Sequence, residues 1–230
     1  EAYDEELQRE TCLEVGIFTH DPIADTRRSN VSDEEMLQVT ETTVSQLIKA
    51  GKFVIAVGGE HAITTGVVSA YQKHFNTPFT VVQIDAHGDL RQEFEGSIHN
   101  HACVMRRVLE KGLPILPVGI RAICQEEAHL IQEKQISVVY AREIFQDGNW
   151  IEKAITQIKT QQVFITIDVD GLDPSLIPGV GTPEPGGLGW YETLRFLRRV
   201  CETYEVIGID VMELAPLSES VVSEFTTAKL

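Results

Sequence analysis

The feature that most constrains the fold of this 230-residue chain is a repeated alternation of short apolar runs with longer amphipathic stretches. The apolar runs are rich in Val and Ile and have no polar side, which is typical of parallel strands covered on both faces. The strand candidates are Leu13–Phe18, Phe53–Val57, Phe79–Ile84, Ile115–Ile120, Ile136–Tyr140, Val163–Ile167 and Val206–Val211. The helix candidates are Asp33–Ala50, Thr65–His74, His101–Lys111, Gln125–Lys134 and Trp190–Thr203, with Ser32 or Asp33 as the N-cap of the first.

This alternation predicts an α/β fold, a three-layer α/β/α sandwich with a mainly parallel sheet. We expect a single domain over residues 1–230, because this length fits one large α/β domain better than two small ones. No run of about 18 apolar residues is present, so we expect no membrane span. The N-terminal segment EAYDEELQRE is unlike a secretory signal, and the four cysteines form no CxxC pair, which together indicate a cytoplasmic protein with reduced thiols.

The net charge of −16 argues against nucleic acid as a partner, because phosphate binding needs clustered Lys and Arg. An acidic chain instead attracts cations, whether a metal ion or a cationic substrate.

Three strand candidates run directly into residue types that bind metals. In open α/β sheets the functional crevice lies outside the carboxyl ends of the strands, so we expect these three ends to converge there. The segments are GGEH at 58–61, DAHGD at 85–89 and DVDGLDP at 168–174.

Within these segments, residues two apart point to the same side of an extended chain. Carboxylates packed together raise each other's pKa, and divalent ions remove that cost. Several carboxylates with two histidines suit manganese better than a thiolate-loving metal. The sequence therefore predicts two metal ions, held by His61, Asp85, His87, Asp89, Asp168 and Asp170, if some of the carboxylates bridge.

With these motifs in place, the chain resembles the ureohydrolase family, which includes arginase and agmatinase. The motifs occur in family order, and the nearest resemblance is to the agmatinase branch, on DLRxxxEG followed by HA. They are GGEHAIT (58–64), DAHGDLRQEFEG (85–96), HNHACVMRR (99–107), DVDGLDPSLIPGVGTPEPGG (168–187) and IGIDVMELAP (207–216).

The resemblance implies a role for each metal-type residue. One manganese ion would be held by His61, Asp85, Asp89 and Asp168, and the other by Asp85, His87, Asp168 and Asp170, with Asp85 and Asp168 bridging. It also implies the α/β/α fold and a homo-oligomer, a trimer or hexamer. Family members are longer, so the chain is expected to be truncated at both ends.

The expected reaction cleaves a guanidino compound into urea and an amine. A metal pair lowers the pKa of a bound water towards neutrality, and Asp89 is placed to accept a hydrogen bond from it. Glu213 matches the family carboxylate that grips the guanidinium. His101 matches the family's proton-shuttling histidine, and imidazole titrates near neutral pH; His99 is the alternative.

Agmatine, which would give putrescine, is the expected substrate, because it is a dication without a carboxylate. Arg91 leaves two alternatives open: it is neutralised by Glu93 or Glu95 and points away, or it binds the carboxylate of a guanidino acid such as guanidinobutyrate. A guanidinase, with nickel, is a further alternative. Arginine and formimidoylglutamate are less favoured, as is a non-catalytic binding homologue, since all six ligands are present.

Overall fold

The computed structural model describes residues 3–23 and 31–230. The chain divides into two compact units, Glu1–Val31 and Ser32–Leu230. In the second unit, six parallel strands form one sheet with the order β1-β6-β5-β2-β3-β4, which confirms the predicted parallel sheet. The strands are β1 (Ile55–Val57), β2 (Thr80–Ile84), β3 (Ile115–Ile120), β4 (Val139–Tyr140), β5 (Gln162–Asp168) and β6 (Glu205–Met212).

The helices of this unit largely follow the predicted ranges. The exceptions are the start of α4, which is a separate 3-10 turn, and α6, α7 and α9, which were not predicted. The helices are α2 (Asp33–Lys49), α3 (Thr64–His74), α4 (Val104–Glu110), α5 (Gln125–Lys134), α6 (Ala141–Gln146), α7 (Trp150–Ile155), α8 (Trp190–Thr203) and α9 (Val222–Thr227). The 3-10 turns are η1 (His61–Ile63), η2 (His101–Cys103) and η3 (Val169–Gly171).

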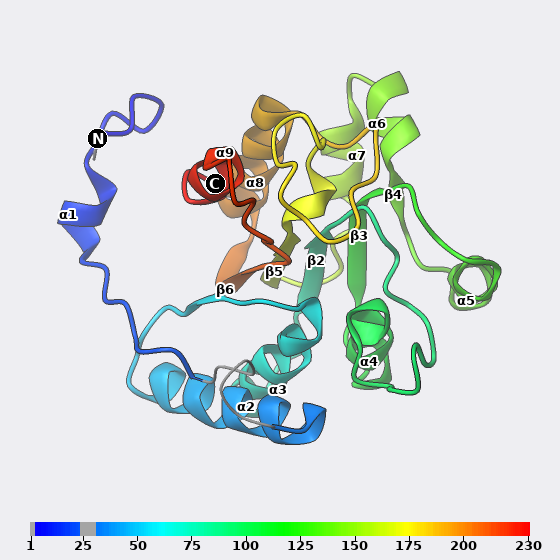
Figure 1. The fold of residues 1–230 in the computed structure, drawn as a ribbon, viewed down its shortest axis with the longest axis horizontal. Coiled ribbons are helices and arrows are strands. Elements are labelled where there is room, and N and C mark those ends of the chain that lie inside the picture. The colour runs from blue at the N-terminus through cyan, green and yellow to red at the C-terminus, as the bar shows by residue number, and fades with distance from the viewer. Residues whose placement is uncertain (1–2, 24–30) are drawn as a thin grey trace. The chain divides into compact units, whose positions relative to one another are not determined.

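The sheet is covered by helices on both faces, as predicted for a three-layer sandwich (Figure 1). Successive strand residues point to opposite faces. Val81 and Phe164 therefore pack in one core with α2, α3 and α4, whereas Val82 and Ile165 pack in the other with α6, α7 and α8. This double coverage explains why the strands lack the polar alternation of a half-exposed sheet.

The first core brings α2 and α3 into close contact. A Cβ atom at Gly66 of α3 would lie 2.7 Å from the carbonyl oxygen of Leu37 in α2, so only glycine allows this approach. Helix α2 begins with a capping box: Ser32 Oγ accepts a hydrogen bond from the Glu35 amide, and Glu35 Oε2 accepts one from the Ser32 amide. Ser32, rather than Asp33, is the N-cap.

The predicted strand Leu13–Phe18 is wrong. Leu13 and Val15 lie in the short helix α1 (Thr11–Val15), Gly16 follows with a positive φ of 70°, and Ile17 and Phe18 belong to no strand. A strand needs a hydrogen-bonded partner. Among the described residues of the first unit, the only ladder contact is the isolated bridge between Asp4 and Arg9, so none of these residues pairs with Leu13–Phe18 as a strand.

In the described residues, no helix is both long and apolar enough to cross a membrane.

Candidate metal centre

The predicted metal-type residues come together at the carboxyl edge of the sheet. His61 opens η1 just after β1, Asp85 follows β2, and Asp168 ends β5. Because β5 and β2 pair directly, with Ile167 opposite Ile84, the segments that follow them start side by side. The described residues contain two groups that could each hold a metal ion: His61 with Asp85 and Asp89, and Asp85 with His87 and Asp170.

The first group is centred on the Nδ1 atom of His61. This nitrogen lies 3.3 Å from Asp85 Oδ2, 3.2 Å from Asp89 Oδ2 and 3.3 Å from Asp168 Oδ2. The His61 side chain is fully buried, and its Nδ1 atom makes no hydrogen bond in the described part of the chain. A buried imidazole nitrogen that faces three carboxylates without a hydrogen bond is an arrangement a cation would complete.

The second group contains His87, whose side chain is 26% exposed. Its Nδ1 atom lies 3.0 Å from Asp170 Oδ2 and 3.7 Å from Asp85 Oδ1. Backbone amides hold these carboxylates in place: the His87 amide donates to Asp85 Oδ1 at 2.6 Å, and the Ala86 amide donates to Asp170 Oδ1 at 3.1 Å. Asp85 thus lies between the two groups.

The electrostatics of the cluster reflect crowded negative charge. Burial, reinforced by the Asp85 charge, raises the pKa of Asp89 to about 7 and also raises the pKa of Asp168 well above its ordinary value. Burial opposes protonation of His87, but hydrogen bonds to Asp170 and Asp85 outweigh it and raise the pKa of His87 to about 11. Divalent cations at this place would relieve the repulsion, so the oxygen-rich donor set fits a pair of such ions.

Two residues of the site have a backbone conformation that most L-residues avoid. Asp89 has a φ of 55° and Glu213 a φ of 66°. Conformations of this kind cost about 1–3 kcal/mol and tend to persist at functional sites. The amide of Glu213 donates to the Gly59 carbonyl at 2.8 Å, and its Oε1 accepts a hydrogen bond from the His61 amide at 2.6 Å. The local structure thus ties Glu213 directly to the cluster of predicted ligands. This metal-type cluster consists of His61, Asp85, His87, Asp89, Asp168 and Asp170.

His101 lies beside this cluster and is held by Glu60. Glu60 Oε1 accepts a hydrogen bond from the His101 amide and contacts its Nδ1 atom, both at 2.9 Å. The hydrogen bond to Glu60 is the main cause of a raised pKa of His101, and the charges of Glu213 and Asp89 add to it. Glu60 thus serves as a hydrogen-bonding group for His101.

Arg91 stacks on an aromatic ring, and the alternative in which it binds the carboxylate of a guanidino acid stays a prediction. Its guanidinium lies over the Phe94 ring, 4.9 Å from the centroid. The Phe94 ring in turn packs edge-on against His101, with 5.9 Å between ring centroids. Among the described residues, no ion pair joins Arg91 to Glu93 or Glu95, so stacking on an aromatic ring, rather than charge pairing, holds Arg91 near the site.

Sequence reasoning missed Arg121, which fastens the loop that carries the second group. Its guanidinium donates hydrogen bonds to the backbone carbonyls of Asp170 at 2.7 Å, Gly171 at 3.2 Å and Glu184 at 2.9 Å. Arg121 directly follows β3. Applying the strand-end rule to Ile115–Ile120 as well would have singled it out.

Sequence reasoning also missed Asp210 on β6 and Thr166 on β5. Both side chains are fully buried. Burial raises the pKa of Asp210 to about 6, although His61, Thr166 and Thr64 favour its charged form. Asp210 lies inside the IGIDVMELAP motif. An acidic residue in an otherwise apolar strand could have identified it from the sequence.

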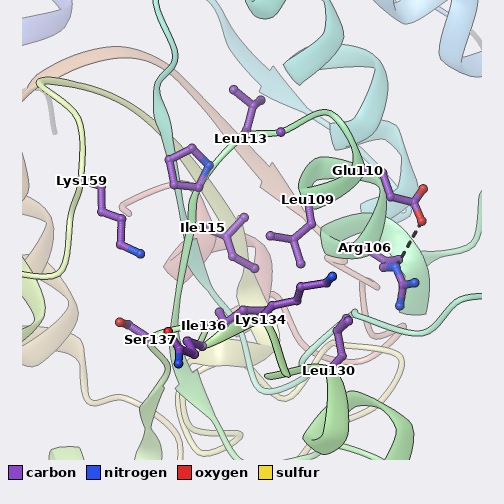
Figure 2. Close-up of a pocket in the computed structure, with 13 residues that line it drawn as sticks. Arg106, Leu109, Glu110, Leu113, Ile115, Leu130, Lys134, Ile136, Ser137 and Lys159 are labelled. Carbon is purple, nitrogen blue, oxygen red and sulfur yellow. Dashed lines mark hydrogen bonds and ion pairs between the residues drawn. The ribbon is translucent and has the colours of Figure 1, made fainter. Parts of the chain in front are cut away.

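A cavity of about 590 Å³ lies away from this chemistry (Figure 2). It is formed by α4, the segment that leads into β3 and the end of α5, at the amino end of the strand. Figure 2 shows Arg106 paired with Glu110 at its rim. No residue of the metal-type cluster lines this cavity, so it is not part of the candidate site.

An α/β/α sandwich with carboxylates and imidazoles gathered at the carboxyl ends of its strands is the arrangement of a metal-assisted hydrolase. The Arginase family model matches residues 2–230, and the chain belongs to this family. It is a ureohydrolase, as the resemblance implied.

Three similar proteins support this assignment. A protein of Synechocystis sp. named N(1)-aminopropylagmatine ureohydrolase is 61% identical over 231 residues, covering 100% of this chain and 76% of that protein. A protein of the same name from Thermus thermophilus is 35% identical, covering 94% of this chain and 72% of that protein. The crystal structure of the agmatine ureohydrolase of Thermoplasma volcanium matches with a TM-score of 0.84 at 31% identity, covering 100% of this chain and 75% of that chain.

Proposed function

We propose that this protein is a two-manganese ureohydrolase that releases urea from an agmatine-type polycation. The observation that carries the proposal is the cluster of His61, His87 and four aspartates, buried except for His87, with Glu213 and His101 beside it. An oxygen-rich set with two imidazoles suits manganese.

The two metal groups would be completed by Asp168, which lies against His61. We assign His61, Asp85, Asp89 and Asp168 to one ion and Asp85, His87, Asp168 and Asp170 to the other. When bound, such a pair supplies a Lewis-acidic centre that lowers the pKa of water and makes it a nucleophile at neutral pH.

The protein residues around this centre then have distinct tasks. Asp89 accepts a hydrogen bond from the attacking water, which fixes its direction. Glu213 orients the planar guanidinium by a charge-assisted contact, since the His61 amide already holds its Oε1 in place. His101 protonates the leaving amine, and its hydrogen bond to Glu60 favours the protonated imidazole that this task requires.

For the substrate, we propose N1-aminopropylagmatine first and agmatine second. The sequence favours a cation without a carboxylate, and the relative with 61% identity is named for the aminopropyl derivative. That compound carries a guanidinium, a secondary ammonium and a primary ammonium. Loss of urea would convert it into spermidine, whereas agmatine would give putrescine. A trimeric or hexameric assembly and a cytoplasmic location stay predictions.

The test is urea release after removal of metal with a chelator and reloading with manganese. Chelation should abolish activity, and about two equivalents of manganese per chain should restore it. Asp168→Asn, which changes a residue assigned to both ions, should cost more activity than His61→Asn, which changes a residue assigned to one. Full activity with less than one equivalent of metal would contradict the two-metal proposal.

The same assay defines the substrate with a panel of guanidino compounds. We expect kcat/KM for N1-aminopropylagmatine and for agmatine to exceed that for arginine by at least about 100-fold, or ~2.7 kcal/mol of transition-state discrimination. If guanidinobutyrate is preferred and Arg91→Ala removes that preference, Arg91 is a carboxylate anchor and the substrate proposal is wrong. Hydrolysis of guanidine alone would indicate a guanidinase instead.

A further inference from the structure

One buried carboxylate takes no part in the proposed chemistry. Asp210 lies in β6 and is fully buried, and neither of its side-chain oxygens makes a hydrogen bond in the described part of the chain. A buried carboxylate without a hydrogen bond is costly. Its position next to the metal-type cluster points to a function that offsets the cost.

The strand register places Asp210 beside Thr166. The two residues are direct partners in the parallel pair β5 and β6, so their side chains point to the same face of the sheet. Thr166 and Thr64 act on the Asp210 carboxylate as donors that favour its charged form and oppose the rise of its pKa on burial, although neither hydroxyl makes a hydrogen bond of ordinary geometry to it in the described part of the chain. Like Asp210, both threonine side chains are fully buried.

Thr166 also contacts His61, on the side of the ring that faces away from the aspartates. Thr166 Oγ1 lies 2.8 Å from His61 Nε2 and 3.5 Å from Thr64 Oγ1. A neutral imidazole carries one proton. If Nδ1 faces a metal ion, Nε2 must carry the proton and donate it to Thr166 Oγ1. The Thr166 hydroxyl then has its own hydrogen to donate onward.

We propose that Asp210 is the terminal acceptor of a hydrogen-bond chain that runs from His61 through Thr166, and that it thereby positions His61 to bind a metal ion through Nδ1. Asp210 is a positioning residue, because it acts on the metal site through Thr166 and touches neither metal nor substrate. Its negative charge orients the Thr166 hydroxyl, and this makes the Thr166 oxygen an acceptor for the Nε2 proton.

The consequence is a fixed ring tautomer and orientation at one of the two metal groups. Histidine ligands usually donate their second nitrogen to a carboxylate or a carbonyl, and loss of that partner typically weakens metal binding about 10- to 100-fold. Here the hydroxyl of Thr166 stands between the imidazole and the carboxylate. The inference rests on the proposed two-metal function.

The test is a titration of metal-free protein with manganese. The electron paramagnetic resonance signal of unbound manganese measures how much is bound at each step. We expect Asp210→Asn to weaken one of the two binding events about 10- to 100-fold and to leave the other unchanged. The thermal stability of the metal-free protein should hold or rise, because a neutral isostere removes the cost of burying the Asp210 charge. A purely structural role would lower stability and metal affinity together.

A second pair of variants tests the relay without changing Asp210. Thr166→Val removes the hydroxyl and should weaken the same binding event, whereas Thr166→Ser should keep it. Combining Thr166→Val with Asp210→Asn should be no worse than Thr166→Val alone, because both changes break one chain. Thr80→Val is the matched control: Thr80 is a buried threonine on β2 whose hydroxyl bonds to Thr160, so manganese affinity should not change.

The outcomes separate the two proposals. If the wild-type chain binds no manganese, the proposed function fails, and this inference fails with it. If the wild-type chain binds two ions but the Asp210 and Thr166 variants bind them equally well, only the inference is overturned. The inference would also be overturned if the losses of manganese affinity in the double variant were additive. The same holds if Thr166→Ser bound manganese as weakly as Thr166→Val. Should Asp210→Asn not fold, the two Thr166 variants still decide the matter.

Discussion

His101 and Glu60 form a well-defined hydrogen-bonded pair beside the metal-type cluster. Glu60 Oε1 contacts both the backbone amide and the Nδ1 atom of His101, so the ring is held by two contacts to one oxygen. This leaves Nε2 as the nitrogen that can exchange a proton with a substrate. His99, the alternative shuttle, has a buried Nδ1 atom without a hydrogen bond in the described part of the chain, and nothing there orients it towards the cluster.

Glu60→Gln should therefore change the pH dependence of the reaction. If His101 donates a proton, activity falls as pH rises through its pKa. Glu60 raises that pKa, so its neutral isostere should move the basic limb of the kcat/KM profile to lower pH. His101→Asn should remove the limb and lower the rate about 10²–10⁴-fold while both metals stay bound. An unmoved limb in Glu60→Gln, with activity kept in His101→Asn, would transfer the role to His99 or to solvent.

At the scale of elements, the sequence was most informative where a strand ends. The runs before Asp85 and Asp168 are apolar on both faces, so the change to carboxylates marks the carboxyl edge of a parallel sheet, where function collects. The segment Leu13–Phe18 has a similar apolar pattern but no partner strand among the described residues of its own unit. Pattern alone could not separate these two cases, because pairing depends on other parts of the chain.

The pairing of Thr166 with Asp210 across two strands could not be predicted from the sequence pattern either. It requires β5 and β6 to be neighbours in a particular register, and the two residues are far apart in the sequence. Arg121 likewise acts by donating hydrogen bonds to the carbonyls of a distant loop. Residue type and spacing predicted the side chains that gather in the metal-type cluster, whereas the residues that hold those side chains depend on strand order and could be found only in the structure.

A capping box stabilises the N-terminus of helix α2, which packs in the first core. Ser32→Ala would remove the acceptor for the Glu35 amide and should destabilise the protein by about 1 kcal/mol. In a domain of about 150–250 residues, this lowers Tm by roughly 2–4 °C. Ser32→Asp, which keeps an acceptor at the N-cap, is the matched control and should restore the Tm. Equal melting of the Ser32→Ala and wild-type proteins would show that the cap contributes nothing measurable.

At the scale of the whole molecule, charge is the dominant property. The chain has 35 acidic and 19 basic residues, for a net charge of −16. Arg121, which lies beside the metal-type cluster, donates its hydrogen bonds to backbone carbonyls. Two bound divalent ions would offset only a small part of the negative charge. The protein therefore presents an attractive field to a cationic substrate approaching from solution.

This field predicts a dependence on ionic strength that increases with substrate charge. The Debye length falls from about 30 Å at 0.01 M to about 3 Å at 1 M, so added salt removes long-range attraction while short contacts in the site persist. Steering of this kind raises association rates by roughly 10- to 10³-fold, so we expect kcat/KM for N1-aminopropylagmatine to fall by about tenfold over that range. The fall should be smaller for agmatine, which carries one charge fewer, and smallest for guanidine or arginine. Manganese content and circular dichroism, measured at each salt concentration, serve as controls for loss of metal or structure. If kcat/KM fell equally with ionic strength for all substrates, the acidic surface would not steer them. The preference among substrates would then arise only from contacts inside the site.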